Sequence, residues 1–289
     1  MNLANTNFSG PLPNTISNLK QLSTIDLSYC QFNGTLPSSM SELTQLDYLD
    51  MSSNYPTGPL PSFNMSKNLK YLSLFRNHLS GDLPSNHFEG LMNLASINLG
   101  FNSFSGNMPP SLLKLPYLRE IKLPFNQLDG LLGEFDNASS PVLEMLDLKG
   151  NNLHGHIPSS VFNLATRLVK LVANMSSSFI DQGIVDSKPV DLCRYQDSVI
   201  LVYKGQQMKL SKIQMAFTYL DMSNNYLEGP IPNELMEFKA LHGLNLSHNA
   251  LMGHIPSSVG NLKNLESLAL SNNFFNGEIP QALSTSSAS

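Results

Sequence analysis

The chain has 289 residues, of which 41% are hydrophobic and 13% are charged, and its formal net charge is −5. This weak negative charge argues against nucleic acid or an anionic membrane surface as the main partner, because both favour clustered Lys and Arg. The sequence has no apolar run of about 18 residues, so it offers no candidate for a membrane-spanning helix.

Nearly the whole chain repeats with a period of about 24 residues. Segments 22–37, 46–61, 69–84, 94–109 and 241–256 share the template L-x-x-L-x-L-x-x-N-x-L-x-G-x-I-P. This period and Leu pattern are those of leucine-rich repeats, whose coils stack because one coil cannot enclose a core. The Asn position is held by Thr6, Cys30, Asn54, Asn77, Asn102, Asn126, Asn151, Ser176, Asn225, Asn249 and Asn273.

Each repeat predicts the same coil. In L-x-x-L-x-L the alternation of apolar and polar residues predicts a short strand, with residues such as Ile25 and Leu27 pointing inward. The Asn amide can hydrogen-bond to the turning backbone of neighbouring coils, and Gly and Pro set the following bend. The remaining dozen residues suit a short helical turn. We therefore expect an α/β solenoid, a curved right-handed superhelix with a parallel sheet on its concave face and 3-10 or helical turns on its convex face.

One stretch interrupts the period and divides the chain. We expect an N-terminal array of about eight coils at 1–176 whose first coil is partial, a non-repeat island at 177–216, three coils at 217–280 and a tail at 281–289. The first and last coils have no polar cap, and we expect the chain to be an internal piece of a longer protein.

Within the island, the apolar run Val199 to Tyr203 predicts a strand, Lys204-Gly205 a turn, and "QQMKL" a returning partner strand. Two interpretations remain open: a tolerated surface insertion, or an island folded back onto the inner side of the solenoid.

The outward-facing positions of the strands, here called slots, form the concave surface. In coils four to six these slots hold aromatic and basic residues. Aromatic residues and Arg anchor many interfaces. The candidate binding residues are Tyr71, Phe75, Arg76, Phe101, Arg119, Lys122 and Phe125. Alternatively, the three Phe side chains lean over the coil edge and pack on one another. As a binding surface, this patch would suit an acidic or sulfated peptide or a pectin-like polyanion.

No catalytic motif is present, so we expect no enzymatic activity, cofactor or metal. Four carboxylates could be mistaken for catalytic pairs, but they occupy the same slot of different coils: Asp26, Asp50, Asp147 and Asp221. We interpret His154 and His156 as solvated turn residues and Cys30 as a buried thiol, and Cys193 has no evident partner. The Asn-x-Ser/Thr glycosylation candidates are Asn7, Asn33, Asn64, Asn137, Asn174 and Asn245.

The fuller template, with L-x-G-x-I-P after the Asn, resembles the plant-specific leucine-rich repeat. Residues 220–273, and the stretch "YQDSVILVYKGQQMKLSKIQMAFTYLDMSNN" at 195–225, resemble the membrane-proximal repeats and island junction of plant receptor-like proteins of the Verticillium-wilt-resistance type. The resemblance implies the recognition module of a receptor-like protein in pathogen perception, on the extracellular face of the plasma membrane. It further implies a peptide or cell-wall carbohydrate ligand, a co-receptor kinase bound through the island and the last three coils, and a membrane anchor through a helix that this chain lacks.

Three alternatives remain open. The repeats also resemble those of secreted polygalacturonase inhibitors, although such inhibitors have no island. An ectodomain fragment of a leucine-rich-repeat receptor kinase fits the repeats as well, and so does a truncated copy without function.

Overall fold

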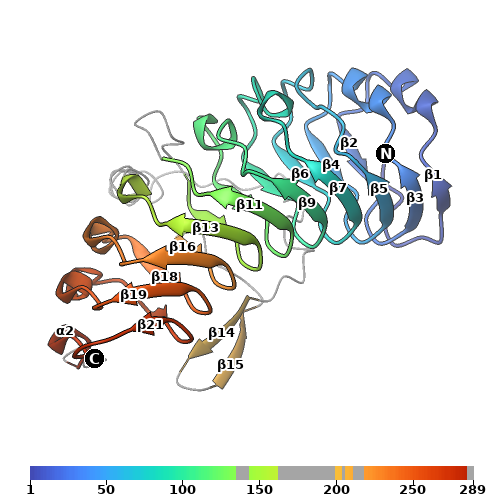
Figure 1. Cartoon of the computed structure of the whole chain (residues 1–289). Helices are drawn as coiled ribbons and strands as arrows, with labels where there is room; N and C mark the ends of the chain where they lie inside the picture. The colour runs from blue at the N-terminus through green and yellow to red at the C-terminus, as the bar shows by residue number, and fades with distance from the viewer. Residues whose placement is uncertain (135–142, 162–198, 204–205, 211–217, 285–289) are drawn as a thin grey trace, which may run out of the picture.

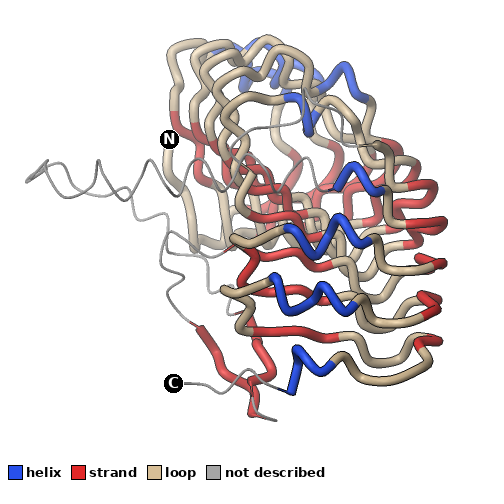
Figure 2. The backbone as a smooth tube through the Cα atoms, turned by 90° about the vertical axis from the view of Figure 1, so that its left-hand side faces the viewer, coloured by secondary structure: helices blue, strands red, loops and turns tan. Residues whose placement is uncertain are grey.

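The computed structural model describes residues 1–134, 143–161, 199–203, 206–210 and 218–284. The repeats form an arch of stacked coils, with strands on its inner side and short helical turns on its outer side (Figure 1). Figure 2 shows the coils of the C-terminal half lying one above another. The predicted α/β leucine-rich-repeat solenoid is confirmed.

Among the described residues, the inner sheet has nine parallel strands, one from each coil that contributes to it. Its strands are β2 (Thr24–Asp26), β4 (Tyr48–Asp50), β6 (Tyr71–Ser73), β8 (Ser96–Asn98), β10 (Glu120–Lys122), β12 (Met145–Asp147), β16 (Thr218–Asp221), β18 (Leu241–Asn245) and β20 (Ser267–Ala269). Equivalent residues of adjacent coils pair in register, for example Tyr48 with Tyr71. Residues in one template slot therefore form a row along the arch, with neighbours about 4.8 Å apart.

A second parallel sheet, with ten strands in the part of the chain that the structure describes, lies beside the first, where the chain runs into the Gly-Pro bend. Its strands are β1 (Ser9–Pro11), β3 (Gln31–Thr35), β5 (Tyr55–Gly58), β7 (His78–Asp82), β9 (Ser103–Gly106), β11 (Gln127–Leu131), β13 (Asn152–His156), β17 (Tyr226–Gly229), β19 (Ala250–Gly253) and β21 (Phe274–Phe275). Gly34, at φ +71°, shows why the template needs Gly at this bend.

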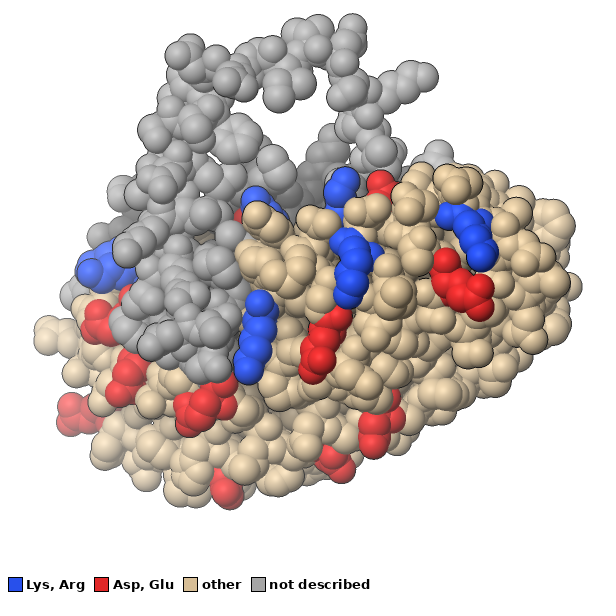
Figure 3. All heavy atoms as spheres, turned by 90° about the horizontal axis from the view of Figure 1, so that it is seen from above, with Lys and Arg blue, Asp and Glu red and all other residues tan. Residues whose placement is uncertain are grey.

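Short helical turns cover the outer side. They are η1 (Asn14–Asn18), η2 (Ser38–Glu42), η3 (Ser85–His87), η4 (Leu112–Lys114), η5 (Ser159–Val161), η6 (Asn233–Glu237), η7 (Ser257–Asn261) and the α-helix α2 (Gln281–Ser284). Seen from this side in Figure 3, Lys and Arg alternate with Asp and Glu over a mostly uncharged surface. The described part of this face therefore has no continuous basic patch of the kind that nucleic acid selects.

Inward-pointing apolar residues and buried Asn amides hold the coils together. Ile25 and Leu27 are 0% and 1% exposed, as the template predicts. The Asn77 amide donates to the carbonyl oxygen of Met51 in the preceding coil (3.1 Å) and to that of Leu74 in its own coil (2.8 Å). The Asn ladder therefore satisfies backbone carbonyls that the stacked coils bury. The Cys30 thiol is buried in this ladder, as expected.

The inner sheet runs directly from β12 to β16, and Leu146 pairs with Leu220. This pairing corrects one expectation, because the coil predicted to end at Ser176 would have to lie between these two strands to extend the sheet. The Leu pattern of that segment suggested a coil, but strand register decides which segments stack. Residues 162–198, with Ser176 and Cys193, lie outside the described residues, and the boundaries of the island remain predictions.

The predicted hairpin within the island is confirmed. Strand β14 (Val199–Tyr203) pairs antiparallel with β15 (Gln206–Leu210), and Tyr203 lies opposite Gln206 across the turn. The hairpin lies at the C-terminal end of the arch, where β14 approaches β20 (Figure 1).

Candidate binding surface on the inner sheet

The slots of the inner strands place the predicted binding residues in adjacent rows. Tyr71 lies on β6 and stacks against Tyr48 of β4, with ring centroids 4.7 Å apart and ring planes 8° from parallel. Tyr48 was not among the predicted site residues. The sequence could have pointed to Tyr48, since Tyr48 and Tyr71 occupy the same slot of consecutive repeats.

The three Phe side chains form a continuous strip, which we call the aromatic strip and define as Phe75, Phe101 and Phe125. The Phe75 and Phe101 ring centroids are 5.2 Å apart, and those of Phe101 and Phe125 are 4.5 Å apart. The rings therefore pack on one another, as one of the two interpretations requires. Phe101 and Phe125 nevertheless remain 43% and 40% exposed, so packing alone does not account for the strip.

Lys149 extends the strip into the next coil, because its Nζ lies 5.4 Å from the centroid of the Phe125 ring. An ammonium group at this distance is attracted to the ring face. Lys149 was absent from the predicted site, because its contact depends on a side-chain conformation that the template does not specify.

The backbone is strained at two residues of the strip, Phe101 and Phe125, and at the neighbouring Arg76. The residue just before the ladder Asn has a positive φ in each described coil, and Arg76, Phe101 and Phe125 have φ values of 55°, 55° and 52°. Elsewhere this position is occupied mostly by Asn, Ser, His or Gly: Asn5, Ser53, Gly150, Asn224, His248 and Asn272, with Tyr29 as the exception. Bulky residues avoid this conformation, which costs on the order of 1 kcal/mol each, whereas Asn and Gly tolerate it.

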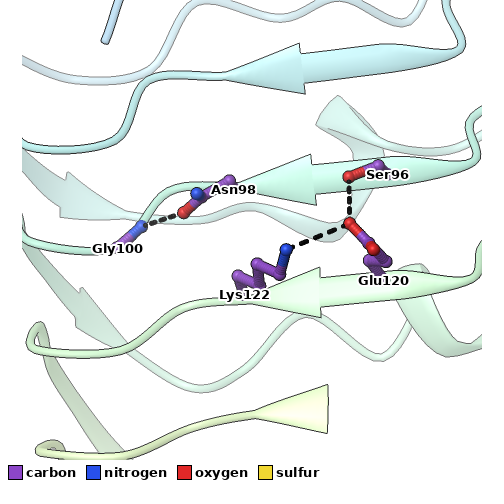
Figure 4. A network of polar contacts seen from close by, with 5 residues as sticks. All are labelled: Ser96, Asn98, Gly100, Glu120 and Lys122. Atoms are coloured by element: carbon purple, nitrogen blue, oxygen red, sulfur yellow. Dashed lines mark hydrogen bonds and ion pairs between the residues drawn. The ribbon is translucent and has the colours of Figure 1, made fainter. Parts of the chain in front are cut away.

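The charged residues of the predicted patch are partly neutralised. Arg119 pairs with Glu144 at 2.6 Å, and Lys122 pairs with Glu120 at 3.2 Å. Figure 4 shows that Glu120 also accepts a hydrogen bond from Ser96, at 2.9 Å. The patch is therefore less positive than its Lys and Arg residues suggest. Arg76 is exposed and has no ion pair with any residue that the structure describes.

The four carboxylates of this row share one structural role, since each accepts a hydrogen bond from the backbone amide two residues further along the chain. Asp50 accepts a hydrogen bond from the amide of Ser52 (2.8 Å), two residues further along the chain. Asn98 accepts the same bond from Gly100 at 3.2 Å (Figure 4). Because an amide replaces the carboxylate in this role, the acidic row is explained by the bend that follows each strand. Desolvation raises the pKa of Asp50 to about 6.

Four of the glycosylation candidates are described. Asn7 and Asn33 are exposed and Asn64 is half-buried. The half-buried Asn245 lies on the inner sheet, where its Oδ1 accepts hydrogen bonds from the amide (3.1 Å) and the hydroxyl (2.7 Å) of Ser247. Asn137 and Asn174 lie outside the described residues, and the presence of glycans remains a prediction.

Within the described ranges, no three His, Cys, Asp or Glu side chains are grouped in a way that would hold a metal ion. No helix in the same part of the chain combines the length and the apolar character that a membrane span requires.

Comparisons with known proteins agree with this geometry. The Leucine Rich Repeat family model matches residues 21–43, 68–90, 142–164, 216–238, 240–262 and 264–286. The chain is 38% identical over 257 residues to Receptor-like protein 32 of Arabidopsis thaliana, covering 83% of this chain and 26% of that protein. It is 36% identical over 262 residues to Receptor-like protein 35 of the same plant, covering 82% and 24%. The chain thus spans about a quarter of the length of these relatives.

Among solved structures, the chain is similar to the Arabidopsis receptor kinase HAESA, which was crystallised with the peptide hormone IDA and the co-receptor SERK1. The TM-score is 0.76 and the sequence identity 27%, over 98% of this chain and 39% of the other. The repeats, the two sheets and these relatives agree. The chain belongs to the plant leucine-rich-repeat proteins of the receptor-like type.

Proposed function

We propose that the chain is the recognition module of a plant cell-surface receptor-like protein and binds its ligand on the inner sheet, over the aromatic strip. The observation that carries the proposal is the strain at Arg76, Phe101 and Phe125. Strained backbone persists where the surrounding structure holds it, and it concentrates at functional sites. Here it presents three large side chains, all exposed, along one edge of the inner sheet.

The ligand class follows from the chemistry of the strip. The packed Phe rings offer an apolar surface, and Arg76 and Lys149 provide positive charge at its two ends, since neither forms an ion pair with a residue that the structure describes. A peptide with acidic or sulfated side chains fits both features, and an anionic cell-wall carbohydrate is the second candidate. The peptide is favoured, because HAESA is a peptide receptor with the same fold.

The wider role is also part of the proposal. The relatives are receptor-like proteins, and HAESA was solved with a co-receptor. We expect this chain to act outside the cell in pathogen perception, with the island and the coils at 217–280 contacting a co-receptor kinase. No catalysis is required for this role, since ligand binding would hold two membrane proteins together.

The substitution Phe101→Asn tests the binding surface. Asn tolerates the positive φ, so the folded state should be destabilised by no more than about 1 kcal/mol even though ring packing is lost. Binding of a sulfated or acidic probe peptide, measured by titration calorimetry, should fall at least tenfold. Tyr29→Asn is the matched control, because it makes the same change in the same slot at φ 53°, outside the strip.

Equal affinity of the two variants and the wild type would show that the strip is structural. Loss of folding in Phe101→Asn but not in Tyr29→Asn would lead to the same conclusion.

A further inference from the structure

A row of charged side chains crosses the inner sheet beside the aromatic strip. Lys122 of β10 pairs in register with Asp147 of β12, which in turn pairs with Asp221 of β16. The two carboxylates therefore lie on neighbouring strands, about 4.8 Å apart at the backbone. Two like charges so close cannot both ionise as easily as one alone.

The two carboxylates differ in the number of hydrogen bonds that they accept. Asp221 Oδ2 accepts bonds from the Tyr219 hydroxyl (3.2 Å) and the Asn245 amide (3.1 Å), and its Oδ1 accepts the amide of Ser223 (2.9 Å). From the described residues, Asp147 accepts one bond, from the amide of Lys149 at 3.1 Å. With one hydrogen bond from the described residues, the ionised form of Asp147 is only weakly stabilised.

The surroundings of Asp147 set the pH range. Desolvation raises the pKa of Asp147 to about 7 and the Asp221 carboxylate adds to the rise, whereas Lys149 and Lys122 oppose it. The other titratable groups on the adjoining strands are Glu120, which pairs with Lys122, and Tyr219. Burial raises the pKa of Tyr219, so this phenol stays a neutral donor.

Lys149 connects the carboxylate to the strip. Its amide donates to Asp147, and its ammonium lies over the Phe125 ring. An ionised Asp147 offsets the positive charge of Lys122 and Lys149. When Asp147 is protonated, that positive charge is no longer offset and can attract an anionic ligand. We propose that Asp147 is a proton-dependent gate, so that the aromatic strip binds anionic ligands more tightly when Asp147 is protonated. The gate rests on the proposed function, because it acts through the same strip.

The test uses short dextran sulfate as the probe, since its sulfate esters stay ionised throughout. Affinity for the wild type should be roughly three- to tenfold higher at pH 6 than at pH 8, the effect of one charge some 5–10 Å away. Asp147→Asn should bind at both pH values as tightly as the wild type does at pH 6. The fold should tolerate this change, because Asn98 and Asn245 occupy the same slot and accept the same amide hydrogen bond.

Asp50→Asn is the matched control, because it removes a carboxylate from the same row far from Lys149, and it should keep the pH dependence. Protonation of histidines would add a pH dependence that Asp147→Asn does not remove, and that result would overturn the gate. Carbon-13 NMR of the Asp147 carboxyl gives an independent readout, with a midpoint near 7 expected and a midpoint below about 5 against the proposal.

The two proposals can fail separately. If the probe binds equally at pH 6 and pH 8 and Arg76→Glu weakens it, the gate is wrong and the binding surface stands. If Arg76→Glu and Phe101→Asn leave binding unchanged, or the probe does not bind at either pH, the strip is not the anion-binding surface and both proposals fall.

Discussion

The side-chain amide of Asn225 donates a hydrogen bond to the main-chain carbonyl of Leu148, 77 residues earlier in the chain (Nδ2 to O, 3.1 Å). The same amide group bonds to Met222 and Ser223 in its own coil, and its oxygen accepts the amide of Leu153. The Asn ladder therefore continues across the interruption as if the two arrays were consecutive.

We predict that Asn225→Ala destabilises the solenoid by about 2–4 kcal/mol, because the change leaves buried backbone groups of two coils without partners. Urea unfolding followed by circular dichroism measures this loss. Asn264→Ala is the control, since that exposed side chain donates one hydrogen bond, to Lys239, and its removal should cost less than about 1 kcal/mol. If both variants lost the same unfolding free energy, the Asn225 amide would stabilise the junction no more than an exposed hydrogen bond does.

Removal of the interruption should leave the fold intact. Deletion of residues 165–214 joins two matched repeats, 142–164 and 216–238, with one residue between them, which is the spacing of the repeats that follow. Because β12 already pairs with β16, we expect the shortened chain to unfold cooperatively with a similar midpoint. Thermal unfolding of both chains measures this. A large drop in midpoint would mean that the deleted segment stabilises the arch, against the interpretation of a tolerated insertion.

The repeat made most of the fold predictable, because each slot has one physical role. The inward Leu residues, the Asn ladder, the Gly bend and the hairpin at 199–210 were all expected from residue type and spacing. The coil ending at Ser176 was not predicted correctly, because a Leu pattern does not reveal which strands pair in register.

The candidate site was less predictable. The template places residues of one slot side by side, so it brought the Phe residues and Arg76 together. It does not reveal which conformer a long side chain adopts. The pairs Arg119 with Glu144 and Lys122 with Glu120, and the contact of Lys149 with Phe125, therefore appear only in the structure.

Cys30 occupies the Asn position of its coil, and this substitution weakens the ladder. Its thiol bonds to the carbonyl of Leu3 (3.1 Å) and contacts the hydroxyl of Thr6 (3.3 Å). In the next coil, Asn54 also accepts the amide of Phe32, a bond that a thiol makes poorly. We predict that Cys30→Asn stabilises the fold by about 1 kcal/mol, measured by urea unfolding. Cys30→Ser supplies a hydroxyl but no amide group, so it should raise the unfolding free energy by less than Cys30→Asn does. An equal increase in the two variants would argue against this explanation.

Asp50 should make the stability of the solenoid depend on pH. Burial raises its pKa in the folded chain from the ordinary value of 3.8 to about 6, so the folded state binds this proton more tightly than the unfolded state. The stabilisation is therefore complete below about pH 4 and is lost as the pH rises through 6. Asp50→Asn should match the wild type at pH 4.5 and exceed its unfolding free energy by about 1–3 kcal/mol at pH 7.5.

Urea unfolding at the two pH values measures this difference. Glu42→Gln is the control, because it removes one charge from an exposed side chain on the outer face and should change little at either pH. If Asp50→Asn were equally or less stable than the wild type at pH 7.5, the carboxylate would be well solvated or well paired in the folded chain. Asp50 would then carry its full charge at neutral pH, and its pKa would lie well below 6.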